Sequence, residues 1–214
     1  MSEVLHPEET ITSCLLIRHG HTRATEEGLL YTDPEAPLTK KGQAQAEALS
    51  KWLPGQKPDL LISSPSLRVR STAAIIASVL ELEPIIIADL NEWHVGQWEG
   101  RTYLDIKKSE PELYHRWSAD PINNAPPGGE SIAQMCLRVK GILESIISRF
   151  AGKRIALVTH AGIIRAAIVE ALSIPVENFW RLSVPVGSVS RLDYSVSFTT
   201  LHYMSFRAET LKAV

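Results

Sequence analysis

The stretch LLIRHGHT, at residues 15–22, is an apolar run that ends abruptly in charged and titratable side chains. The run reaches back to Cys14, and near-continuous apolar residues are typical of a parallel strand that is covered on both faces. Arg18 and His19 end it, and Gly20 follows, where the missing side chain lets other groups come close. In an open parallel sheet, ligands bind in the crevice beyond the carboxyl ends of the strands. The stretch therefore predicts both a buried strand and the position of a functional site.

Three further apolar runs predict strands of the same kind, namely DLLIS at 59–63, PIIIA at 84–88 and RIALVT at 154–159. The patterns between and after these runs predict helices over 40–53, 66–80, 130–150 and 161–172. Residues 188–204 predict one or two final strands. Because strands and helices alternate along the chain, we expect an α/β fold, a three-layer αβα sandwich around a mostly parallel central sheet.

The chain of 214 residues fits a single domain, residues 1–214, because this length supports one hydrophobic core. It contains no repeat, no low-complexity tract and no linker that would divide it. Only residues 101–127, rich in Tyr, Trp, Pro and Asn, form an irregular stretch that interrupts the alternation. We expect this segment to form a small lid.

The composition indicates which classes of partner the protein is expected to bind. The 22 Lys and Arg residues are scattered and balanced by 24 Asp and Glu residues, which argues against a nucleic-acid-binding surface. Cys14 and Cys136 stand in apolar surroundings, which predicts reduced core thiols and a cytoplasmic location. The first ten residues contain no signal peptide, and no run approaches the ~20 apolar residues of a membrane span, so no membrane partner is expected. An exposed sheet edge or the lid is available for a homodimer.

Side chains suited to phosphoryl chemistry follow the predicted strands. They are Arg18 and His19, Arg68 and Arg70, Glu92, and His160. Guanidinium groups match phosphate oxygens in bidentate pairs, and a helix that begins after His160 adds the partial positive charge of its N-terminus. A neutral imidazole can attack phosphorus and form a phosphohistidine. The carboxyl group of Glu92 can protonate the leaving oxygen and later accept a proton from water.

Each of these residues also has an ordinary structural interpretation. Arg18 and His19 alone would suit an ion pair at a strand end, and His160 alone would suit a hydrogen-bonded histidine. Arg68 and Glu92 alone would suit the solvent-exposed surface. Their shared location at strand ends is what chance does not easily explain, and it favours the functional interpretation.

A metal site is a rival interpretation, because His19 and His21 form an HxH pair of the kind that binds zinc in some hydrolases. The remaining ligands are hard to find, since no further cluster of His or Asp has the spacing that would complete a site. We therefore expect no metal.

Six motifs carry a specific resemblance to a known family. They are LLIRHGHT at 15–22, PLTKKGQAQA at 37–46, SSPSLRVRSTA at 63–73, LNEWHVGQWEG at 90–100, PPGGES at 126–131 and VTHAGIIR at 158–165. In their order and spacing, from about residue 14 to 172, the chain resembles the histidine phosphatase superfamily. The matching branch contains cofactor-dependent phosphoglycerate mutases and small-molecule phosphatases.

The resemblance implies a role for each matching residue. His19 is implied as the nucleophile and Glu92 as the proton donor and acceptor, while Arg18, Arg68 and His160 are implied to hold the phosphate oxygens. No metal or cofactor is implied, because the guanidinium and imidazole groups supply the positive charge. We further hypothesise that the two arginines lower the affinity of His19 for protons and keep it nucleophilic.

The sequence also gives expectations for three further residues, Arg70, His21 and Thr25. Arg70 lies outside the implied phosphate contacts, and we expect it to form a structural salt bridge. His21 stands where the family usually has Glu, and Thr25 stands where it usually has Asn. The second departure is expected to weaken one phosphate contact, but neither removes a catalytic group.

Hydrolysis is favoured over mutase activity. The mutase branch generally carries a longer insertion after the segment with the acid, whereas only 25 residues separate Gly100 from Pro126 here. The other alternative is a silent binding protein, but no catalytic group is missing. We therefore expect a metal-independent phosphatase that acts on a small phosphate ester.

The substrate is less well specified by the sequence. The lid residues Tyr103, Tyr114, His115 and Trp117 either stack on a flat ring of the substrate or pack the lid, and packing is favoured. The tail FWRLSVPVGSVSRLDY at 179–194 is similar to that of alpha-ribazole phosphatases. Alpha-ribazole 5'-phosphate is therefore one candidate, and sugar phosphates, phosphoglycerates and nucleotides stay open.

Overall fold

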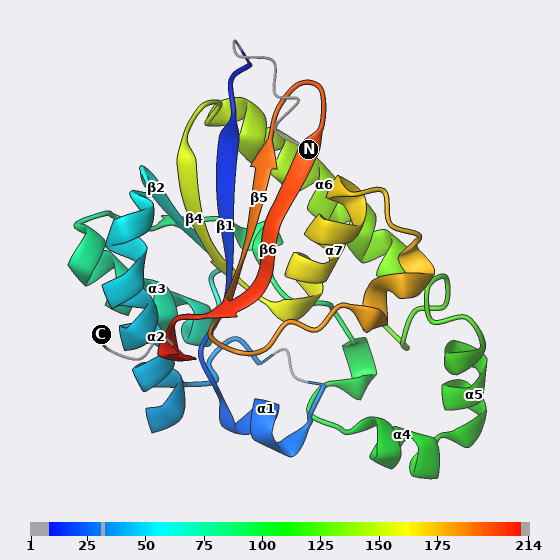
Figure 1. The fold of residues 1–214 in the computed structure, drawn as a ribbon. Coiled ribbons are helices and arrows are strands. Elements are labelled where there is room, and N and C mark those ends of the chain that lie inside the picture. The colour runs from blue at the N-terminus through cyan, green and yellow to red at the C-terminus, as the bar shows by residue number, and fades with distance from the viewer. Residues whose placement is uncertain (1–8, 31–32, 211–214) are drawn as a thin grey trace.

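A computed structural model describes residues 9–30 and 33–210 of the chain, and it is built around one six-stranded sheet (Figure 1). The strands are β1 (Thr12–Arg18), β2 (Leu60–Ser63), β3 (Ile85–Ile86), β4 (Arg154–Thr159), β5 (Ser188–Tyr194) and β6 (Thr199–Arg207). Their order across the sheet is β3-β2-β4-β1-β5-β6. The first four are parallel, and β5 and β6 continue the sheet as antiparallel strands. The N-terminal stretch 1–8, within which no signal peptide is expected, lies outside the described residues.

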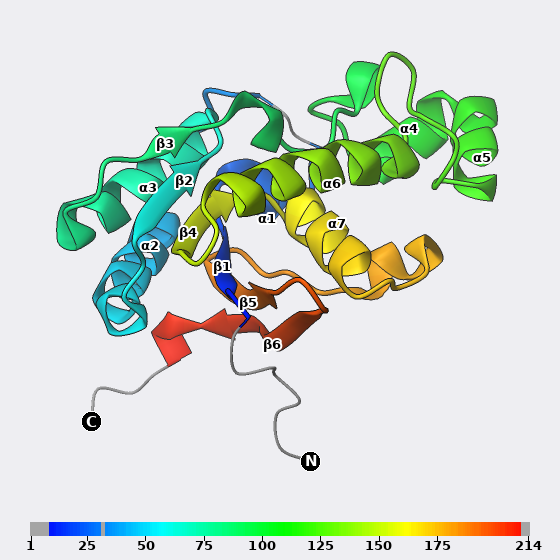
Figure 2. The same cartoon turned by 90° about the horizontal axis from the view of Figure 1, so that it is seen from above.

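Helices cover both faces of the sheet. The α-helices are α1 (Arg23–Glu27), α2 (Lys40–Trp52), α3 (Leu67–Leu80), α4 (Tyr103–Ser109), α5 (Pro111–Ala119), α6 (Ile132–Arg149) and α7 (Ala161–Ala171). Short 3-10 helices occupy Leu53–Gln56, Ala88–Leu90, Gly96–Trp98, Val176–Arg181 and Ala208–Thr210. Viewed from above, α2 and α3 lie on one face of the sheet and α6 and α7 on the other (Figure 2). The predicted three-layer α/β sandwich is confirmed.

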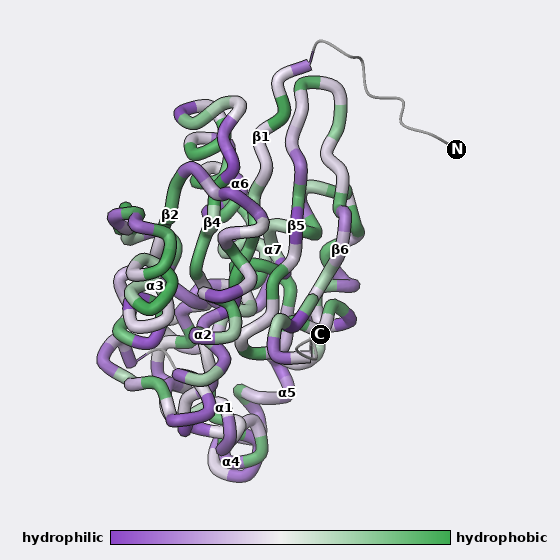
Figure 3. The backbone as a smooth tube through the Cα atoms, turned by 60° about the vertical axis from the view of Figure 1, so that its left-hand side comes forward, coloured by the Kyte–Doolittle hydropathy of each residue, from purple (hydrophilic) through white to green (hydrophobic). Residues whose placement is uncertain are grey.

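The central strands bury their side chains on both faces. In β1, Cys14 and Leu16 belong to the core cluster on the side of α6 and α7, whereas Leu15 and Ile17 belong to the cluster on the side of α2 and α3. Fully burying one such leucine or isoleucine contributes about 1.5–3 kcal/mol. This two-sided burial explains why the strands read as continuous apolar runs, which Figure 3 shows along β2 and β4.

Local capping sets where the predicted helices begin. The Thr39 hydroxyl accepts a hydrogen bond from the Gly42 amide and caps α2, as the sequence predicts. At α6, Ser131 and Gln134 exchange hydrogen bonds in a capping box. The boundaries of the helices at 66–80 and 161–172 also agree with the structure within one residue at each end.

The strand predicted at 84–88 is mostly wrong. Only Ile85 and Ile86 form β3, and the chain then turns into a 3-10 helix. β3 is an edge strand whose one neighbour is β2, and the Ile86 side chain is half exposed. Few side-chain contacts are therefore available to stabilise a longer pairing between β3 and β2. The region 188–204 does form two strands, β5 and β6, which pair as an antiparallel hairpin.

The lid segment 101–127 is more regular than predicted, because it contains α4 and α5. Thr102 and Asp105 form a capping box at the start of α4, and Pro111 occupies the first turn of α5, where its missing N–H costs no hydrogen bond. Both helices are too short for the periodic pattern on which the sequence prediction depends. They lie beyond the sheet, on the side where β1 ends (Figure 1).

Among the described residues, no helix combines the length and the apolar character that crossing a membrane requires.

Candidate active site

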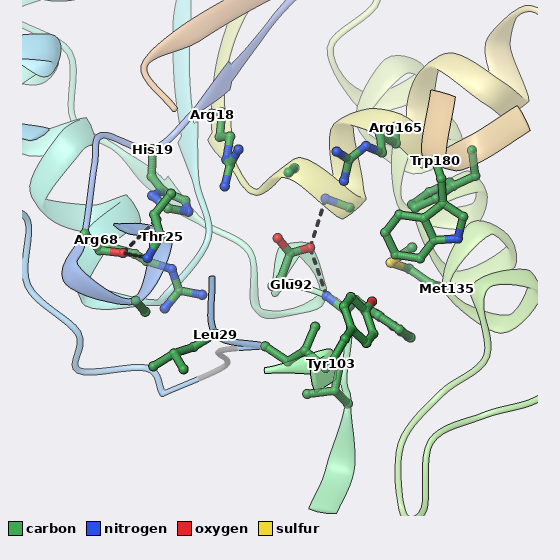
Figure 4. A pocket seen from close by; sticks show the side chains of 18 residues that line it. Arg18, His19, Thr25, Leu29, Arg68, Glu92, Tyr103, Met135, Arg165 and Trp180 are labelled. Carbon is green, nitrogen blue, oxygen red and sulfur yellow. Dashed lines mark hydrogen bonds between the residues drawn. The ribbon is translucent and has the colours of Figure 1, made fainter. Parts of the chain in front are cut away.

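A cavity of about 210 Å³ opens at the carboxyl ends of β1 and β2 and beside the start of α7 (Figure 4). Four of the five predicted site residues line it, namely Arg18, His19, Arg68 and Glu92. The fifth, His160, lies behind them and is fully buried, with its ring centroid 5.4 Å from that of His19. The structure therefore brings together residues from four separate segments of the chain.

The contacts of His19 define which ring nitrogen is free. Its Nδ1 lies 2.8 Å from the carbonyl oxygen of Gly20. Because a carbonyl oxygen only accepts hydrogen bonds, Nδ1 carries the proton and Nε2 keeps its lone pair. The Gly20 amide donates in turn to the Thr72 hydroxyl at 3.1 Å, which holds the turn after β1 in place. This tautomer leaves the lone pair on Nε2 of His19 able to act as a nucleophile.

The protonation state of His19 also suits a nucleophile. Burial lowers the pKa of His19 well below its ordinary value, and the charges of Arg18 and Arg68 lower it further. The direction agrees with the hypothesis made from the sequence, but the largest cause is burial, which the sequence argument did not include. At neutral pH the ring is therefore uncharged.

A chain of hydrogen bonds fixes His160. Arg68 Nη2 donates to Nδ1 of His160 at 3.3 Å, so the ring proton is on Nε2, which donates to the Ser64 hydroxyl at 3.0 Å. The Ser64 hydroxyl then donates to Oδ1 of Asn91 at 3.1 Å. Burial and the nearby Arg68 lower the pKa of His160 well below its ordinary value. His160 is therefore held in one tautomer and in contact with a cavity-lining arginine.

The two arginines present their charge in surroundings with little water. Arg18 Nη1 donates to the Val184 carbonyl at 2.6 Å, while its buried Nε has no hydrogen-bond partner among the described residues. Burial lowers the pKa of Arg18 to about 10. Arg68 is 3% exposed and donates through Nη1 to the Asp33 carbonyl at 2.8 Å. One buried and one partly buried guanidinium group beside a neutral imidazole are chemically suited to bind a phosphate group.

Glu92 lies across the cavity from His19 and is held at the N-terminus of α7 (Figure 4). Its Oε1 accepts hydrogen bonds from the amides of Trp93 and Gly162, each at 3.0 Å. A Cβ atom at position 162 would lie 2.4 Å from the same oxygen, so only glycine leaves room for the carboxylate. The VTHAGIIR motif thus contains His160 and also, through Gly162, holds the carboxylate of Glu92 in position.

Glycines bring the turn after β1 into direct contact with α2. A Cβ atom at Gly20 would lie 2.4 Å from the Gly42 carbonyl oxygen, and one at Gly42 would lie 2.2 Å from the His21 carbonyl oxygen. In addition, the His21 amide donates to Gln45 Oε1 at 2.9 Å. The second sequence motif, at 37–46, therefore acts by supporting the turn that carries His19.

The remaining sequence expectations have clear structural outcomes. His21 does not line the cavity, and its Nδ1 lies 2.9 Å from the Thr39 hydroxyl. Thr25 does line it, with its hydroxyl 2.9 Å from that of Thr22. Arg70 forms the expected salt bridge, with Glu35 at 3.8 Å on the surface. In the described part of the chain, no three His, Cys, Asp or Glu side chains are grouped to hold a metal ion.

The lid aromatics divide into two groups. Tyr103 lines the cavity, whereas Tyr114, His115 and Trp117 do not. Trp117 is buried, with its ring stacked on that of Tyr103 at 5.3 Å and in edge contact with Trp98 at 5.3 Å. His115 is exposed. Tyr114 packs against the same core cluster as Trp117, which agrees with the favoured interpretation that these side chains pack the segment. Of the four residues, Tyr103 alone lines the cavity.

Sequence reasoning missed Arg165 and the aromatic wall around it. Arg165 lines the cavity, and its Nε donates to the Leu182 carbonyl at 2.8 Å. Its guanidinium carbon lies 5.7 Å from the ring centroids of both Phe179 and Trp180, which also line the cavity. The available signal was helical spacing, since Arg165 lies one turn after Ala161 and so shares the face of α7 that borders the cavity.

Comparisons with known proteins agree with this geometry. The model of the histidine phosphatase superfamily (branch 1) matches residues 14–206. The adenosylcobalamin/alpha-ribazole phosphatase of Escherichia coli is 32% identical over 193 residues, which are 90% of this chain and 95% of that protein. The metal-independent phosphoserine phosphatase of Arabidopsis thaliana is 33% identical over 168 residues, which are 77% of this chain and 71% of that protein.

Solved structures give the same result. The crystal structure of the alpha-ribazole phosphatase from Shigella flexneri superposes with a TM-score of 0.84 and 30% identity, over 94% of this chain and 100% of that chain. The six motifs, the fold and the family match thus agree along most of the sequence. The chain belongs to the histidine phosphatase superfamily, branch 1.

Proposed function

We propose that the protein hydrolyses phosphomonoesters of small metabolites without a metal, through a phosphohistidine at His19. The observation that carries the proposal is the hydrogen bond from Nδ1 of His19 to the Gly20 carbonyl, which leaves a bare Nε2 in a cavity lined by Arg18 and Arg68. A neutral imidazole with a free lone pair, beside two guanidinium groups, is suited to attack a bound phosphate ester.

In the first step, Nε2 of His19 forms a bond to phosphorus while the bond from phosphorus to the ester oxygen breaks. The electron pair of that bond goes to the leaving oxygen, which takes a proton from the carboxyl group of Glu92. Arg18 and Arg68 stabilise the charge on the three remaining phosphate oxygens. The location of Glu92 across the cavity from His19 supports this division of roles.

His160 joins the phosphate contacts through its Nδ1. In the absence of phosphate, this nitrogen accepts a hydrogen bond from Arg68. A bound dianion favours a second proton on the ring, which converts Nδ1 into a donor toward a phosphate oxygen. Nε2 meanwhile keeps its bond to Ser64, so the ring orientation is maintained.

In the second step, Glu92 accepts a proton from water, and the resulting hydroxide oxygen bonds to phosphorus as the bond from phosphorus to Nε2 of His19 breaks. The electron pair returns to the imidazole and inorganic phosphate leaves. The proton that Glu92 gave up in the first step is thereby replaced, so the cycle is balanced.

Hydrolysis is supported over mutase activity and silent binding by the named relatives, which are phosphatases. The names also support two substrate candidates for this chain, alpha-ribazole 5'-phosphate and phosphoserine. The aromatic side chains of Trp93, Tyr103 and Trp180 along the cavity suit the flat ring system of the first candidate. The cytoplasmic location, the single domain with a lid at 101–127, and a homodimer through a sheet edge or the lid stay predictions.

The test is replacement of His19 by alanine together with trapping of the intermediate. We expect the His19→Ala variant to lose hydrolysis of p-nitrophenyl phosphate by about 10⁴-fold or more, because the attacking atom is gone. When wild-type protein is quenched in alkaline denaturant during turnover of a ³²P-labelled ester, the label should be on the peptide that contains His19. Label on another residue, or an unchanged rate in the variant, would refute the proposal.

A further inference from the structure

We propose that Glu130 and Arg138 form a clamp that positions Glu92, and that this pair controls leaving-group protonation without touching the substrate. Glu130 belongs to the PPGGES motif, and Arg138 lies on α6. Neither residue lines the cavity. The inference rests on the proposed function of Glu92 as the proton donor.

Arg138 holds the chain on the N-terminal side of Glu92. Its Nη1 donates to the carbonyl oxygen of Asp89 at 2.6 Å and to that of Asn91 at 3.2 Å. These two residues precede Glu92 by three positions and by one. The segment contains little regular structure, since the 3-10 helix that precedes it ends at Leu90. The arginine therefore supplies hydrogen bonds that secondary structure would supply elsewhere.

Glu130 holds the chain on the C-terminal side of Glu92. Its carboxylate accepts from the His94 amide at 3.1 Å, and its carbonyl oxygen accepts from Nε1 of Trp93 at 2.7 Å. Its own amide donates to the His94 carbonyl at 2.8 Å. Three contacts with two consecutive residues fix the direction in which the chain leaves Glu92.

The two halves of the clamp are joined by a forked ion pair. Arg138 Nε lies 3.2 Å from Oε2 of Glu130, and Nη2 bonds to Oε1. The side chains are 26% and 18% exposed, so water screens this pair less than it would a pair on the open surface. A fork of this kind fixes relative orientation as well as distance.

Close backbone packing supports the same arrangement. A Cβ atom at Gly129 would lie 2.4 Å from the His94 carbonyl oxygen, and one at Gly96 would lie 2.2 Å from the Pro127 carbonyl oxygen. The PPGGES segment thus lies directly against the segment after Glu92. The PPGGES motif thus has a structural role beside Glu92, although none of its side chains lines the cavity.

The clamp predicts a specific kinetic defect. If Glu92 moves, the phosphate contacts of Arg18 and Arg68 remain, so transfer from an aryl phosphate, whose leaving oxygen needs little protonation, should persist. Transfer from an alkyl phosphate should fall. Removal of the phosphohistidine by water should also slow, because the same carboxylate accepts the proton from water.

The experiment compares Glu92→Gln, Arg138→Gln and Arg138→Lys with wild-type protein on sn-glycerol 3-phosphate and p-nitrophenyl phosphate. We expect Glu92→Gln to lower the ratio of kcat/KM on the alkyl ester to that on the aryl ester by about 10²-fold. Arg138→Gln should lower the same ratio by about tenfold, as expected for a residue that orients a functional group. Arg138→Lys keeps the charge but not the forked contact, so its ratio should lie between those of Arg138→Gln and wild type.

Three further measurements separate a positioning role of Arg138 from general damage to the fold. Arg149→Gln removes an exposed arginine from the last turn of the same helix and should leave the ratio within about twofold of wild type. Orthovanadate, used as an inhibitor, reports on the phosphate end, and its inhibition constant should be nearly the same for Arg138→Gln and wild type. In the double variant with Glu92→Gln, the Arg138→Gln change should lower the ratio no further, because the group that it positions is absent.

The possible results are distinct. If Glu92→Gln itself shows no dependence on the leaving group, the proposed function of Glu92 is wrong. If Glu92→Gln shows the dependence but Arg138→Gln lowers kcat/KM on both substrates and the affinity for vanadate equally, the clamp is only structural and the inference is overturned. Accumulation of phosphohistidine in Arg138→Gln during turnover of p-nitrophenyl phosphate would support the inference independently of the ratio.

Discussion

The cavity has two ends that are built in different ways. The end proposed to bind phosphate is lined by Arg18, His19 and Arg68, with His160 buried behind them. These side chains stand at strand ends and in the first turns of the following helices, and three of the four are at most 4% exposed. The end that would face the leaving group uses loops, the lid and the 3-10 helix Val176–Arg181, and its Trp180 is 41% exposed. Under the proposed function, strand ends would thus bind the reacting phosphate group, whereas irregular segments would bind the part that differs between substrates.

The largest expected effect comes from the phosphate end. Arg68→Met should lower kcat/KM about 10³-fold on all phosphomonoesters alike, because it removes charge stabilisation from the phosphate oxygens that every substrate shares. Steady-state kinetics on one aryl and two alkyl esters measures this. Arg70→Met is the matched control, since Arg70 lies two residues further on, at the surface, and should stay within about twofold of wild type. Unequal losses among substrates would contradict the division between the two ends.

A smaller and selective effect is expected at the other end. Arg165 lines the cavity with Nε bound to the Leu182 carbonyl, and no salt bridge is found for it among the described residues. Its guanidinium group is therefore available to a negatively charged part of the substrate. Arg165→Met should reduce the preference for O-phosphoserine over O-phosphoethanolamine, which lacks the carboxylate, by about tenfold, equivalent to about 1.4 kcal/mol.

The control for this variant is Arg181→Met. Arg181 is exposed, follows Trp180 directly and does not line the cavity, so the preference should not change. Equal preference in wild type and Arg165→Met would show that the end facing the leaving group does not select by charge. A larger loss on a nucleoside 5'-phosphate than on phosphoserine would indicate that the guanidinium instead contacts a flat ring.

The same contrast explains what could be predicted from the sequence. Arg18, His19, Arg68, Glu92 and His160 could be located because each lies directly after an apolar run or in a short motif, so local patterns place them. For Arg165 the only signal was its helical spacing from Ala161, and for Trp180 there was none, since the contact between these two side chains depends on how α7 packs against the 3-10 helix that follows it.

The fold was predictable to a similar extent. The buried central strands were found because burial on both faces leaves a continuous apolar run, whereas β3 was overestimated because its edge position limits pairing to two residues. In the segment 101–127, α4 and α5 have 7 and 9 residues, and the ring of Tyr103 on α4 stacks on that of Trp117 on α5. Such a contact between separate helices leaves no periodic signal in the sequence.

The last expected effect concerns the stability of the fold rather than the rate, and it depends on the burial of His160. Burial lowers the pKa of His160 well below its ordinary value in the folded chain, whereas the unfolded chain should titrate near about 6.5. Below that pH the unfolded state binds a proton that the folded state does not, so the free energy of unfolding should fall as the pH is lowered from about 6.5 to 5. Each such histidine contributes a slope of at most about 1.4 kcal/mol per pH unit.

Urea unfolding of His160→Gln at pH 7, 6 and 5 measures this slope. We expect the free energy of unfolding of the variant to depend less steeply on pH than that of wild type, by up to about 1.4 kcal/mol per pH unit, which is the slope for one bound proton. This should hold even if the variant is less stable at every pH. If His160→Gln shows the wild-type slope, the folded chain does not exclude this buried histidine from protonation, and its burial does not contribute to the pH dependence of stability.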